Sequence, residues 1–327
     1  MKKKSLFLFI ILLLVVSLPA CQSGPSSSDT VEVSVGTLND EIVKFEVNLS
    51  DGKLIDSSRK VIAGVSTGIK VPIDIETNGS NLLHVLSQGT PSINPSIRIF
   101  SDTAEGNAIP ERVIDITESG FKPIGLALAE RTEFLFVSYF SDIPADTVKI
   151  VRFDLSGNRT VFKIPARSIG DIEMNKDRSM LFAVDPAGSQ ILASRINSNF
   201  ELQPVSGLIS GSNTGLNKPN SIALTDNDIF VFDMRAGADI GRLFGYSLST
   251  PGNVSPPVTL WNYCGTGKEF FTPYGIAVFE SFGLKIFLTC SANRLITFRS
   301  DANGCADPLQ KIDIGAPVSI AVDRVTF

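Results

Sequence analysis

The chain has 327 residues, of which 43% are hydrophobic, with 34 acidic residues against 29 Lys and Arg and a net charge of −5. This acidic balance argues against nucleic acid or an anionic lipid surface as a partner, because both are bound through basic patches. The single histidine excludes metal sites built from several imidazoles. The sequence also lacks the glycine motifs that bind phosphate groups or dinucleotides.

The first twenty residues have the features of an export signal. Three lysines at positions 2–4 precede an uncharged apolar run over residues 6–16, which is shorter than the roughly 20 residues that span a bilayer. The run ends in Leu-Pro-Ala-Cys at residues 18–21, which resembles the bacterial lipobox, in which the Cys receives a lipid. We predict a signal peptide over residues 1–20 and Cys21 as the acylated first residue of the mature protein. The alternative is ordinary cleavage that leaves Cys21 unmodified.

A short polar segment follows the predicted lipid site. Residues 21–29 are rich in Ser and carry little to bury, which predicts a flexible tether before a folded domain over residues 30–327. Removing residues 1–20 leaves 26 basic and 34 acidic residues, so the mature net charge is −8. We expect an exported protein whose membrane anchor is the lipid. Gln22 resembles the residue of lipoproteins sent to the outer membrane of a diderm cell.

The rest of the chain has the pattern of β-strands. Apolar stretches of five to seven residues are separated by turn formers, as around residues 134–137, 229–232 and 286–289. No stretch keeps a 3.6-residue apolar period for three helical turns. The domain is therefore predicted to be all-β.

An internal repeat defines the predicted architecture. Six segments share a leading residue that is usually Pro, a small or acidic residue at the third position and a short apolar strand. They begin at residues 72, 123, 169, 219, 273 and 317, with spacings of 51, 46, 50, 54 and 44 residues. A second aliphatic and aromatic strand follows the first five. A period of this length is typical of the four-stranded blades of a β-propeller.

The last repeat is incomplete, because only residues 317–327 remain. An open ring would leave an exposed sheet edge. The unassigned N-terminal strands over residues 31–35, 42–47 and 60–62 have the alternation needed to complete that blade. We predict six blades, the last closed by the N-terminal strands. The alternative of seven blades needs a repeat that the sequence does not contain.

The repeats resemble the NHL and YVTN-type propellers. The resemblance lies in Leu-Phe-Ala-Val-Asp at residues 181–185, in Ile-Phe-Val-Phe-Asp at residues 229–233 and in the Pro-x-Gly-Ile-Ala type of strand. It covers most of residues 70–327 and implies the propeller fold. Propellers host both binding and catalysis, so the resemblance does not choose between them.

Four carboxylates replace small residues in two of the repeats: Asp74, Glu76, Asp171 and Glu173. Clustered oxygen ligands near the axis would suit Ca²⁺. The resemblance to lactonase-like propellers, in which a channel metal activates a bound water, would then imply hydrolysis. The alternative is that these carboxylates pair with Lys or Arg, or accept hydrogen bonds from backbone N–H groups.

The longest connections are predicted to share one face of the propeller, formed by the loops between the second and third strands and between successive blades. Long loops on a rigid scaffold are common recognition sites. Charged and aromatic residues there form a candidate binding face for a protein or glycan: Asp142, Asp146, Asp185, Asp233, Arg235, Asp239, Arg242, Trp261, Tyr263, Phe270 and Tyr274, with Phe271 beside them. The alternative is turn capping by Asp185 and Asp233 and packing by Trp261 and Phe271.

His84 and the late cysteines complete the set of reactive side chains. His84 lies in an apolar strand and is expected to be a strand residue rather than the base of a catalytic triad. The predicted register places Cys264 and Cys290 at one end of the blades and Cys305 at the other, about 17–20 Å away. Because a disulfide needs Cα atoms within about 7 Å, we predict a Cys264–Cys290 bridge and a free Cys305.

Taken together, these features favour a membrane-tethered, monomeric propeller that binds a ligand or an envelope partner, protein or glycan, without a catalytic role or cofactor. The alternative is a Ca²⁺-dependent, lactonase-like hydrolase that uses the four carboxylates. A purely structural surface protein is the third reading.

Overall fold

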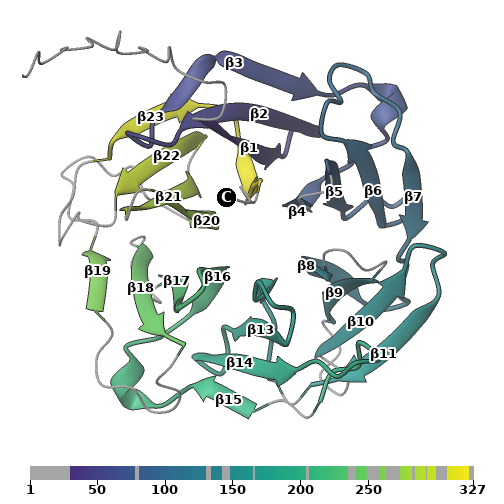
Figure 1. The fold of residues 1–327 in the computed structure, drawn as a ribbon. Helices are drawn as coiled ribbons and strands as arrows, with labels where there is room; N and C mark the ends of the chain where they lie inside the picture. Colours follow the sequence, from purple (N-terminus) through teal and green to yellow (C-terminus); the bar gives the residue numbers. More distant parts are fainter. Residues whose placement is uncertain are drawn as a thin grey trace, which may run out of the picture.

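The computed structural model describes residues 30–77, 81–129, 134–141, 148–164, 166–203, 206–234, 241–248, 258–262, 273–281, 284–291, 293–299 and 308–323. These residues form an all-β propeller in which four-stranded antiparallel sheets surround a central axis (Figure 1). In each sheet one strand lies next to the axis and the fourth lies at the rim.

Three sheets come from the first half of the repeats. The first sheet contains β4 (Pro72–Thr77), β5 (Leu82–Ser87), β6 (Ser96–Ser101) and β7 (Arg112–Asp115). The second contains β8 (Lys122–Ala129), β9 (Phe134–Phe140), β10 (Val148–Asp154) and β11 (Arg159–Lys163). The third contains β12 (Ile172–Met174), β13 (Met180–Asp185), β14 (Gln190–Arg195) and β15 (Ser206–Ile209).

The remaining sheets follow the same order. The fourth contains β16 (Pro219–Leu224), β17 (Asp228–Met234), β18 (Gly241–Ser247) and β19 (Val258–Asn262). The fifth contains β20 (Pro273–Ser281), β21 (Leu284–Ser291), β22 (Arg294–Arg299) and β23 (Gln310–Asp313). A composite sheet joins β24 (Pro317–Val322) to β1 (Thr30–Thr37), β2 (Glu41–Asn48) and β3 (Leu54–Ile62).

The ring therefore consists of five blades of consecutive strands and the composite sheet that closes it. The predicted count of six is met when the composite sheet is counted as a blade, and the described residues form no further sheet for the alternative of seven. The predicted pairing of the N-terminal strands with the last strand is confirmed, since Val35 of β1 lies opposite Ile320 of β24. Closure by distant segments removes the open edges that a partial ring would leave.

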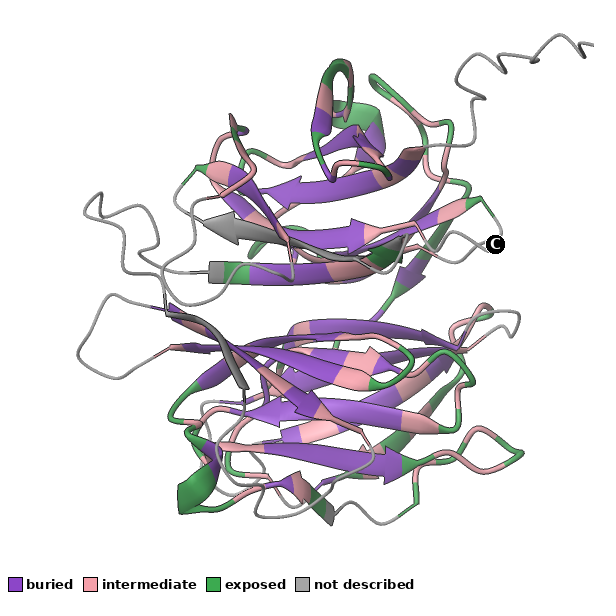
Figure 2. Cartoon of the chain, turned by 60° about the vertical axis from the view of Figure 1, so that its left-hand side comes forward, coloured by how far each residue is buried: buried purple, intermediate pink, exposed green. Residues whose placement is uncertain are grey.

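Burial explains why the apolar runs form these strands. The second strand of a blade is covered on both faces, so it is apolar almost throughout, as in β5 and β13. The rim strands alternate between partly buried and exposed positions, as in β11. Figure 2 shows the buried residues in the strands and the exposed ones in turns and rim segments.

The cores lie between neighbouring sheets. Leu86 and Ile97 of the first sheet pack with Leu126 and Val137 of the second, and each of these side chains is fully buried. Equivalent clusters join the other neighbours around the ring. Because each sheet contributes to two cores, the propeller is stabilised by burial of apolar surface on both faces of every blade.

A buried ion pair lies where the composite sheet meets the first sheet. Lys44 of β2 is 1% exposed, its Nζ lies 2.5 Å from Oε1 of Glu32, and it donates to the backbone carbonyl of Asp102. Burial raises the pKa of Glu32, and the neighbouring Lys44 opposes that rise. The ammonium group thus links β1, β2 and the turn that follows β6.

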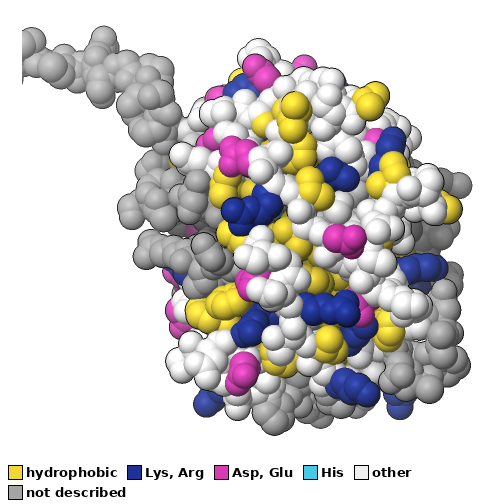
Figure 3. All heavy atoms as spheres, turned by 90° about the vertical axis from the view of Figure 1, so that its right-hand side faces the viewer, with side chains coloured by type: hydrophobic (Ala, Val, Ile, Leu, Met, Phe, Trp, Pro, Cys, Tyr) yellow, Lys and Arg dark blue, Asp and Glu magenta, His cyan; other side chains and the backbone are white. Residues whose placement is uncertain are grey.

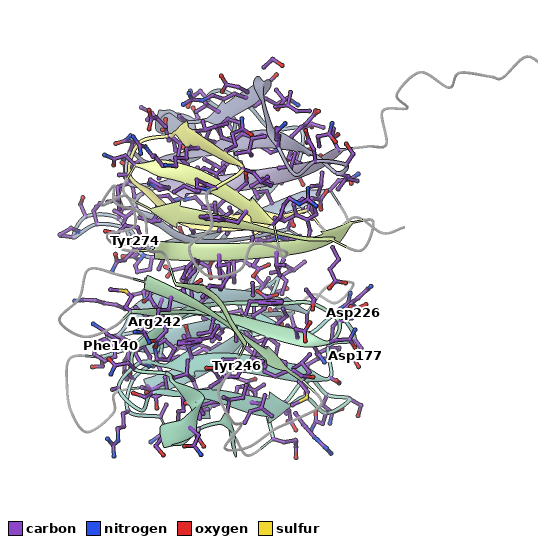
Figure 4. The ribbon with its side chains drawn as sticks, turned by 90° about the vertical axis from the view of Figure 1, so that its left-hand side faces the viewer. Phe140, Asp177, Asp226, Arg242, Tyr246 and Tyr274 are labelled. Carbon is purple, nitrogen blue, oxygen red and sulfur yellow. The ribbon has the colours of Figure 1, made fainter. Side chains whose placement is uncertain are left out.

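The propeller has two faces, named here by what they carry. The turn face carries the β12–β13 turn with Asp177 and the β16–β17 turn with Asp226, and the loop face carries Phe140, Arg242 and Tyr274 (Figure 4). Short 3-10 helices η1 (Val65–Thr67) and η2 (Ser212–Thr214) lie in connections between sheets. In the part of the chain that the structure describes, neither helix has the length to cross a membrane.

The rim of the molecule beside β7 and β11 has no uniform chemical character. Apolar side chains are interspersed with basic and acidic ones on this side (Figure 3). Val113 of β7 and Val161 of β11 are exposed. This rim therefore has neither a large exposed apolar patch nor an electrostatic potential of a single sign. The candidate sites therefore lie near the axis and on the two faces.

Candidate functional site

The third residue of each repeat connects one innermost strand to the next. Asp74 accepts a hydrogen bond from the backbone N–H of Leu126, with a distance of 2.6 Å from N to Oδ2. Asp171 accepts one from the backbone of Ile222 at 3.1 Å and one from the Ser221 hydroxyl at 2.9 Å. These side chains reach across the gap between blades and satisfy backbone donors at the edge that faces the axis.

At the same third position of the repeat, other blades have smaller residues. The Ser221 hydroxyl accepts a hydrogen bond from the N–H of Ile276 at 3.2 Å. At Gly125, a Cβ atom would lie only 3.1 Å from the backbone nitrogen of Ile172, so that blade approaches its neighbour directly. The small or acidic residues of the repeat therefore serve one geometric purpose, contact between adjacent innermost strands. We call this set of contacts the inner ring.

Both aspartates of the inner ring are partly buried. Burial raises the pKa of Asp171 to about 6, although the N–H and hydroxyl donors oppose the rise. The pKa of Asp74 is raised well above its usual value, first by burial and then by the charge of Asp171. The charge of each carboxylate therefore disfavours ionisation of the other.

A cavity of about 330 Å³ opens at the turn-face end of the axis. Its walls come from the innermost strands of several sheets and include Ile75, Ile276 and Ile320. Among the described residues, those that line it and carry charge are five acids and one base: Glu76, Glu173, Asp226, Glu280 and Asp323, with Lys176. We call this the axial cavity. It combines an apolar wall with an acidic surround, and its size is in the range of small-ligand sites.

One ion pair at the cavity involves a residue of each sign. Lys176 Nζ lies 3.3 Å from Asp226 Oδ2, and both side chains are well exposed. An exposed pair of this kind contributes little to stability. With this pair counted, the described residues that line the cavity still carry more negative than positive charges.

The four carboxylates predicted as Ca²⁺ ligands divide into two pairs. Asp74 and Asp171 belong to the inner ring, where their oxygens accept backbone N–H groups. Glu76 and Glu173 line the axial cavity. Within the described residues, no three His, Cys, Asp or Glu side chains come together as a metal-binding group. Among the described residues the four carboxylates thus do not form one metal-binding group, and the two aspartates accept backbone N–H groups as the alternative interpretation proposed.

Asp185 and Asp233 were candidates for the binding face, and the structure corrects this assignment. Their side chains are 0% and 1% exposed. Asp185 accepts hydrogen bonds from Ser168, Gly188 and Gln190 at 2.9–3.1 Å. It therefore caps its turn, as the alternative interpretation proposed, and also holds the preceding loop.

Asp233 has the same role in the fourth sheet. Its Oδ1 accepts the backbone N–H groups of Asn217 and Lys218 at 2.8 and 2.7 Å. Burial raises the pKa of Asp233, and these hydrogen bonds oppose the rise. Both aspartates are buried anchors for the connections between blades, so neither can contact a partner.

Two residues of the predicted binding face lie on the loop face as expected. Tyr274 is 48% exposed and Arg242 is half-buried (Figure 4). Phe140 lies on the same face and was not predicted. Asp142, Asp146, Arg235, Asp239, Tyr263, Phe270 and Phe271 lie outside the described residues, and of Trp261 only the backbone in β19 is described.

His84 is a buried strand residue, as predicted. It is 3% exposed, and its Nδ1 atom has no hydrogen-bond partner among the described residues. Burial lowers the pKa of His84 to about 4. It lines a second, smaller cavity of about 180 Å³ between the first and second sheets, together with Phe134 and Leu155.

The predicted disulfide lies largely outside the described residues. Cys290 is the second last residue of β21, opposite Gly275, which agrees with its predicted place at the end of that strand. Cys264, Cys305 and the predicted lipid site Cys21 fall outside. The Cys264–Cys290 bridge remains a prediction.

The residues at the outer end of the axial cavity were not predicted from the sequence. Lys176, Asp226, Glu280 and Asp323 lie where an innermost strand turns into the next strand or ends. A signal for them existed, since each follows a repeat strand within a few residues. That signal is weak, because charged residues are common in turns.

Comparison with known proteins identifies the architecture. No family model matches the sequence, and no curated protein matches it. Among solved structures, one from a nidogen/laminin complex has a TM-score of 0.63 and 14% identity, covering 90% of this chain and 98% of that chain.

Two lactonase-like structures are similar to the same degree. A putative 6-phosphogluconolactonase from Bacteroides fragilis has a TM-score of 0.60 and 14% identity, covering 91% of this chain and 99% of its own. A periplasmic gluconolactonase from Pseudomonas aeruginosa has a TM-score of 0.58 and 15% identity, covering 91% and 100%. At such identities the likeness concerns the fold alone: this chain has a β-propeller fold similar to those of the three structures.

Proposed function

We propose that the chain is an exported lipoprotein of the cell envelope whose propeller binds a ligand instead of catalysing a reaction. The observation that carries this proposal is the axial cavity of about 330 Å³, which is walled by innermost strands and surrounded by acids. A rigid ring of packed blades supplies a preformed site of this size. The protein would act as a monomer.

Charge defines the class of ligand. Five acidic residues and one basic residue line the cavity, so its potential favours a cation. Apolar side chains such as Ile276 and Ile320 cover part of the wall. The matching ligand is a small molecule or exposed side chain with a cationic group and an apolar portion.

A matched pair of probes tests this site. Hexylammonium carries both features, whereas hexanol has the same chain without the charge. Titration calorimetry at low salt should show binding of hexylammonium, weaker binding in 0.5 M salt and none of hexanol. Glu173→Gln should weaken binding several-fold, and Asp154→Asn, at the end of β10 and not among the cavity residues, should not. Equal binding of both probes, or none, would contradict the proposal.

A hydrolase is the second candidate, favoured by the fold likeness to structures described as gluconolactonases. Its weakness lies in this chain's own residues, because Asp74 and Asp171 hold backbone N–H groups of neighbouring strands. A thermal shift with and without Ca²⁺ separates the two candidates. We expect no shift. A clear stabilisation by Ca²⁺ that Asp171→Asn abolishes would favour the hydrolase.

The membrane anchor is a further part of the proposal, supported by the sequence. Three lysines, the apolar run and the lipobox-like residues before Cys21 support export and acylation. In a diderm cell, Gln22 favours the outer membrane. Cys21→Ala should release the protein from the membrane fraction and abolish incorporation of a labelled fatty acid. Retention of the label would contradict acylation at Cys21.

The loop face is proposed as a second surface, for a protein or glycan of the envelope. Exposed Tyr274 and half-buried Arg242 on this face support it, because Tyr and Arg are enriched at binding surfaces. Tyr274→Ala would then reduce capture of envelope partners by the tethered protein. Glu46→Ala, on the composite sheet, is the matched control.

A further inference from the structure

We propose that the propeller stands on its membrane with the turn face inward, so that the axial cavity opens toward the lipid and the loop face points away. This inference rests on the proposed lipid anchor at Cys21. It identifies which envelope components can reach each surface. Ligands of the cavity come from the membrane side, and partners of the loop face come from the opposite side.

The first step is the place where the chain enters the fold. Strand β1 begins at Thr30, which lies opposite Asn48, the last residue of β2. The next residue, Leu49, lines the axial cavity. The N–H of Asp323, another cavity residue, donates to the carbonyl of Glu32. The chain therefore enters the propeller on the turn face, beside the cavity.

The second step is the direction of the first strands. From Thr30, β1 runs to Thr37, where the turn at residues 38–40 leads into β2 on the loop face. Strand β2 then returns over eight residues to Asn48. At about 3.3 Å per residue, the seven steps from Glu41 to Asn48 place the two ends of β2 roughly 23 Å apart. That length separates the two faces at this sheet.

The third step compares this length with the tether. The sequence predicts a flexible tether over residues 22–29, between the predicted lipid site and β1, and a tether of eight residues would span about 15 Å on average. If the loop face met the membrane, the tether would have to run the full length of a strand, close to its maximum extension. With the turn face inward it needs no such extension. Chain entropy therefore favours the turn face.

Charge determines how closely this face approaches the lipid. The acids at the cavity, together with Asp177 of the neighbouring turn, are repelled by an anionic membrane. The propeller should therefore stand off the surface by the length of its tether. That gap leaves the cavity accessible to small ligands and side chains at the membrane, and too narrow for a folded domain.

The test measures which face lies nearer the lipid. The full lipidated protein is inserted in phosphatidylcholine vesicles that carry an acceptor dye on a headgroup. A clickable amino acid bears the donor, which leaves the native cysteines unchanged. One matched pair of positions is Ala187 on the loop face and Ser198 on the turn face, at the two ends of β14. A second pair is Asn39 and Ser50, at the two ends of β2.

We expect energy transfer to be at least about twofold higher from Ser198 than from Ala187, and from Ser50 than from Asn39, because each pair is separated by a strand length. Equal or reversed transfer within either pair would overturn the orientation. If both Asn39 and Ser50 show higher transfer than both Ala187 and Ser198, the ring lies on its side. That result would also overturn the proposed orientation.

A flotation assay distinguishes failure of the orientation from failure of the anchor. Lipidated protein that floats with the vesicles, while Cys21→Ala does not, establishes the anchor independently of orientation. If the parent protein fails to float, the anchor and the orientation are both wrong. If it floats and the transfer is unequal in the opposite sense, only the orientation is wrong.

Discussion

Burial shifts the pKa values of Asp171 and His84 in opposite directions: it raises that of the aspartate and lowers that of the histidine. In each case burial disfavours the ionised form. The aspartate therefore resists losing its proton and the histidine resists gaining one. Their contributions to stability consequently depend on pH with opposite signs, and each can be measured separately.

The pKa of His84 falls from an ordinary value of 6.5 to about 4 in the folded protein. The unfolded chain binds the proton first, so stability is complete above pH 6.5 and is lost as the pH falls toward 4, by up to about 3 kcal/mol. His84→Leu should remove this loss. Urea unfolding at pH 7, 6, 5 and 4 measures it. If the free energy of unfolding of the variant depends on pH as steeply as that of the parent, His84 is not the group responsible for the loss.

Asp171 acts in the opposite direction. Its folded pKa of about 6 exceeds the ordinary 3.8, so its contribution is present below pH 3.8 and is lost as the pH rises to 6, by up to about 3 kcal/mol. Asp171→Asn keeps an acceptor for Ile222 and removes the charge. The free energy of unfolding of the variant, compared with that of the parent, should therefore be more favourable at pH 7 than at pH 4.

The exposed Asp177, whose pKa is lowered by hydrogen bonds from Ser179, provides the control for this prediction. Asp177→Asn should lose stability slightly at neutral pH, where the carboxylate caps its turn. The same urea series reports both variants. An Asp171→Asn protein less stable than the parent at pH 7 would show that the carboxylate is required in its charged form.

At the scale of the strands, the approach of neighbouring innermost strands limits which residues they tolerate. A Cβ atom on Gly125 would lie 3.1 Å from the Ile172 nitrogen and 3.3 Å from the Asp171 Cα, both backbone atoms that cannot move independently. Gly125→Ala should therefore reduce the free energy of unfolding by about 1–3 kcal/mol.

Gly207 is the matched control, because the atoms nearest to its added Cβ belong to the side chains of Gln190 and Ser210. Gly207→Ala should leave the free energy of unfolding within about 0.5 kcal/mol of the parent. Thermal and urea unfolding of both variants measures the difference. Equal effects at the two glycines would mean that the second and third sheets separate easily to accept a methyl group.

The strands and their closure could be predicted from the sequence because their signals are local and repeated. Pro72, Pro219, Pro273 and Pro317 each begin an innermost strand. The third repeat is less regular: its leading Ile169 precedes β12, which covers only Ile172–Met174. The N–H of Gly170 and the carbonyl of Asp171 instead pair with Val184.

The candidate site was less predictable, because its residues are brought together by different sheets. The acids of the axial cavity come from positions between 76 and 323, and nothing local marks them as neighbours. Asp185 and Asp233 looked exposed because acids usually are. Their donors lie about sixteen residues earlier in the chain, at positions 168 and 217, and only the folded sheets bring the two together.

At the scale of the whole molecule, the ring depends on the contact between its first and last strands. Ser34 of β1 is buried and lies between Lys44 of β2 and Ala321 of β24. A proline at this central position removes a ladder hydrogen bond and leaves a buried acceptor unsatisfied. We expect Ser34→Pro to reduce the free energy of unfolding by about 2–4 kcal/mol.

The matched control is Ser57→Pro, because Ser57 is exposed in the outer strand β3 and falls where the pairing of β2 with β3 is interrupted. It should have a much smaller effect. Since every sheet packs on two neighbours, opening the ring at β1 exposes both adjoining cores, and Ser34→Pro should shift the entire thermal transition while it remains single. A separate early transition, or equal effects of the two prolines, would show that the ring holds without the composite sheet.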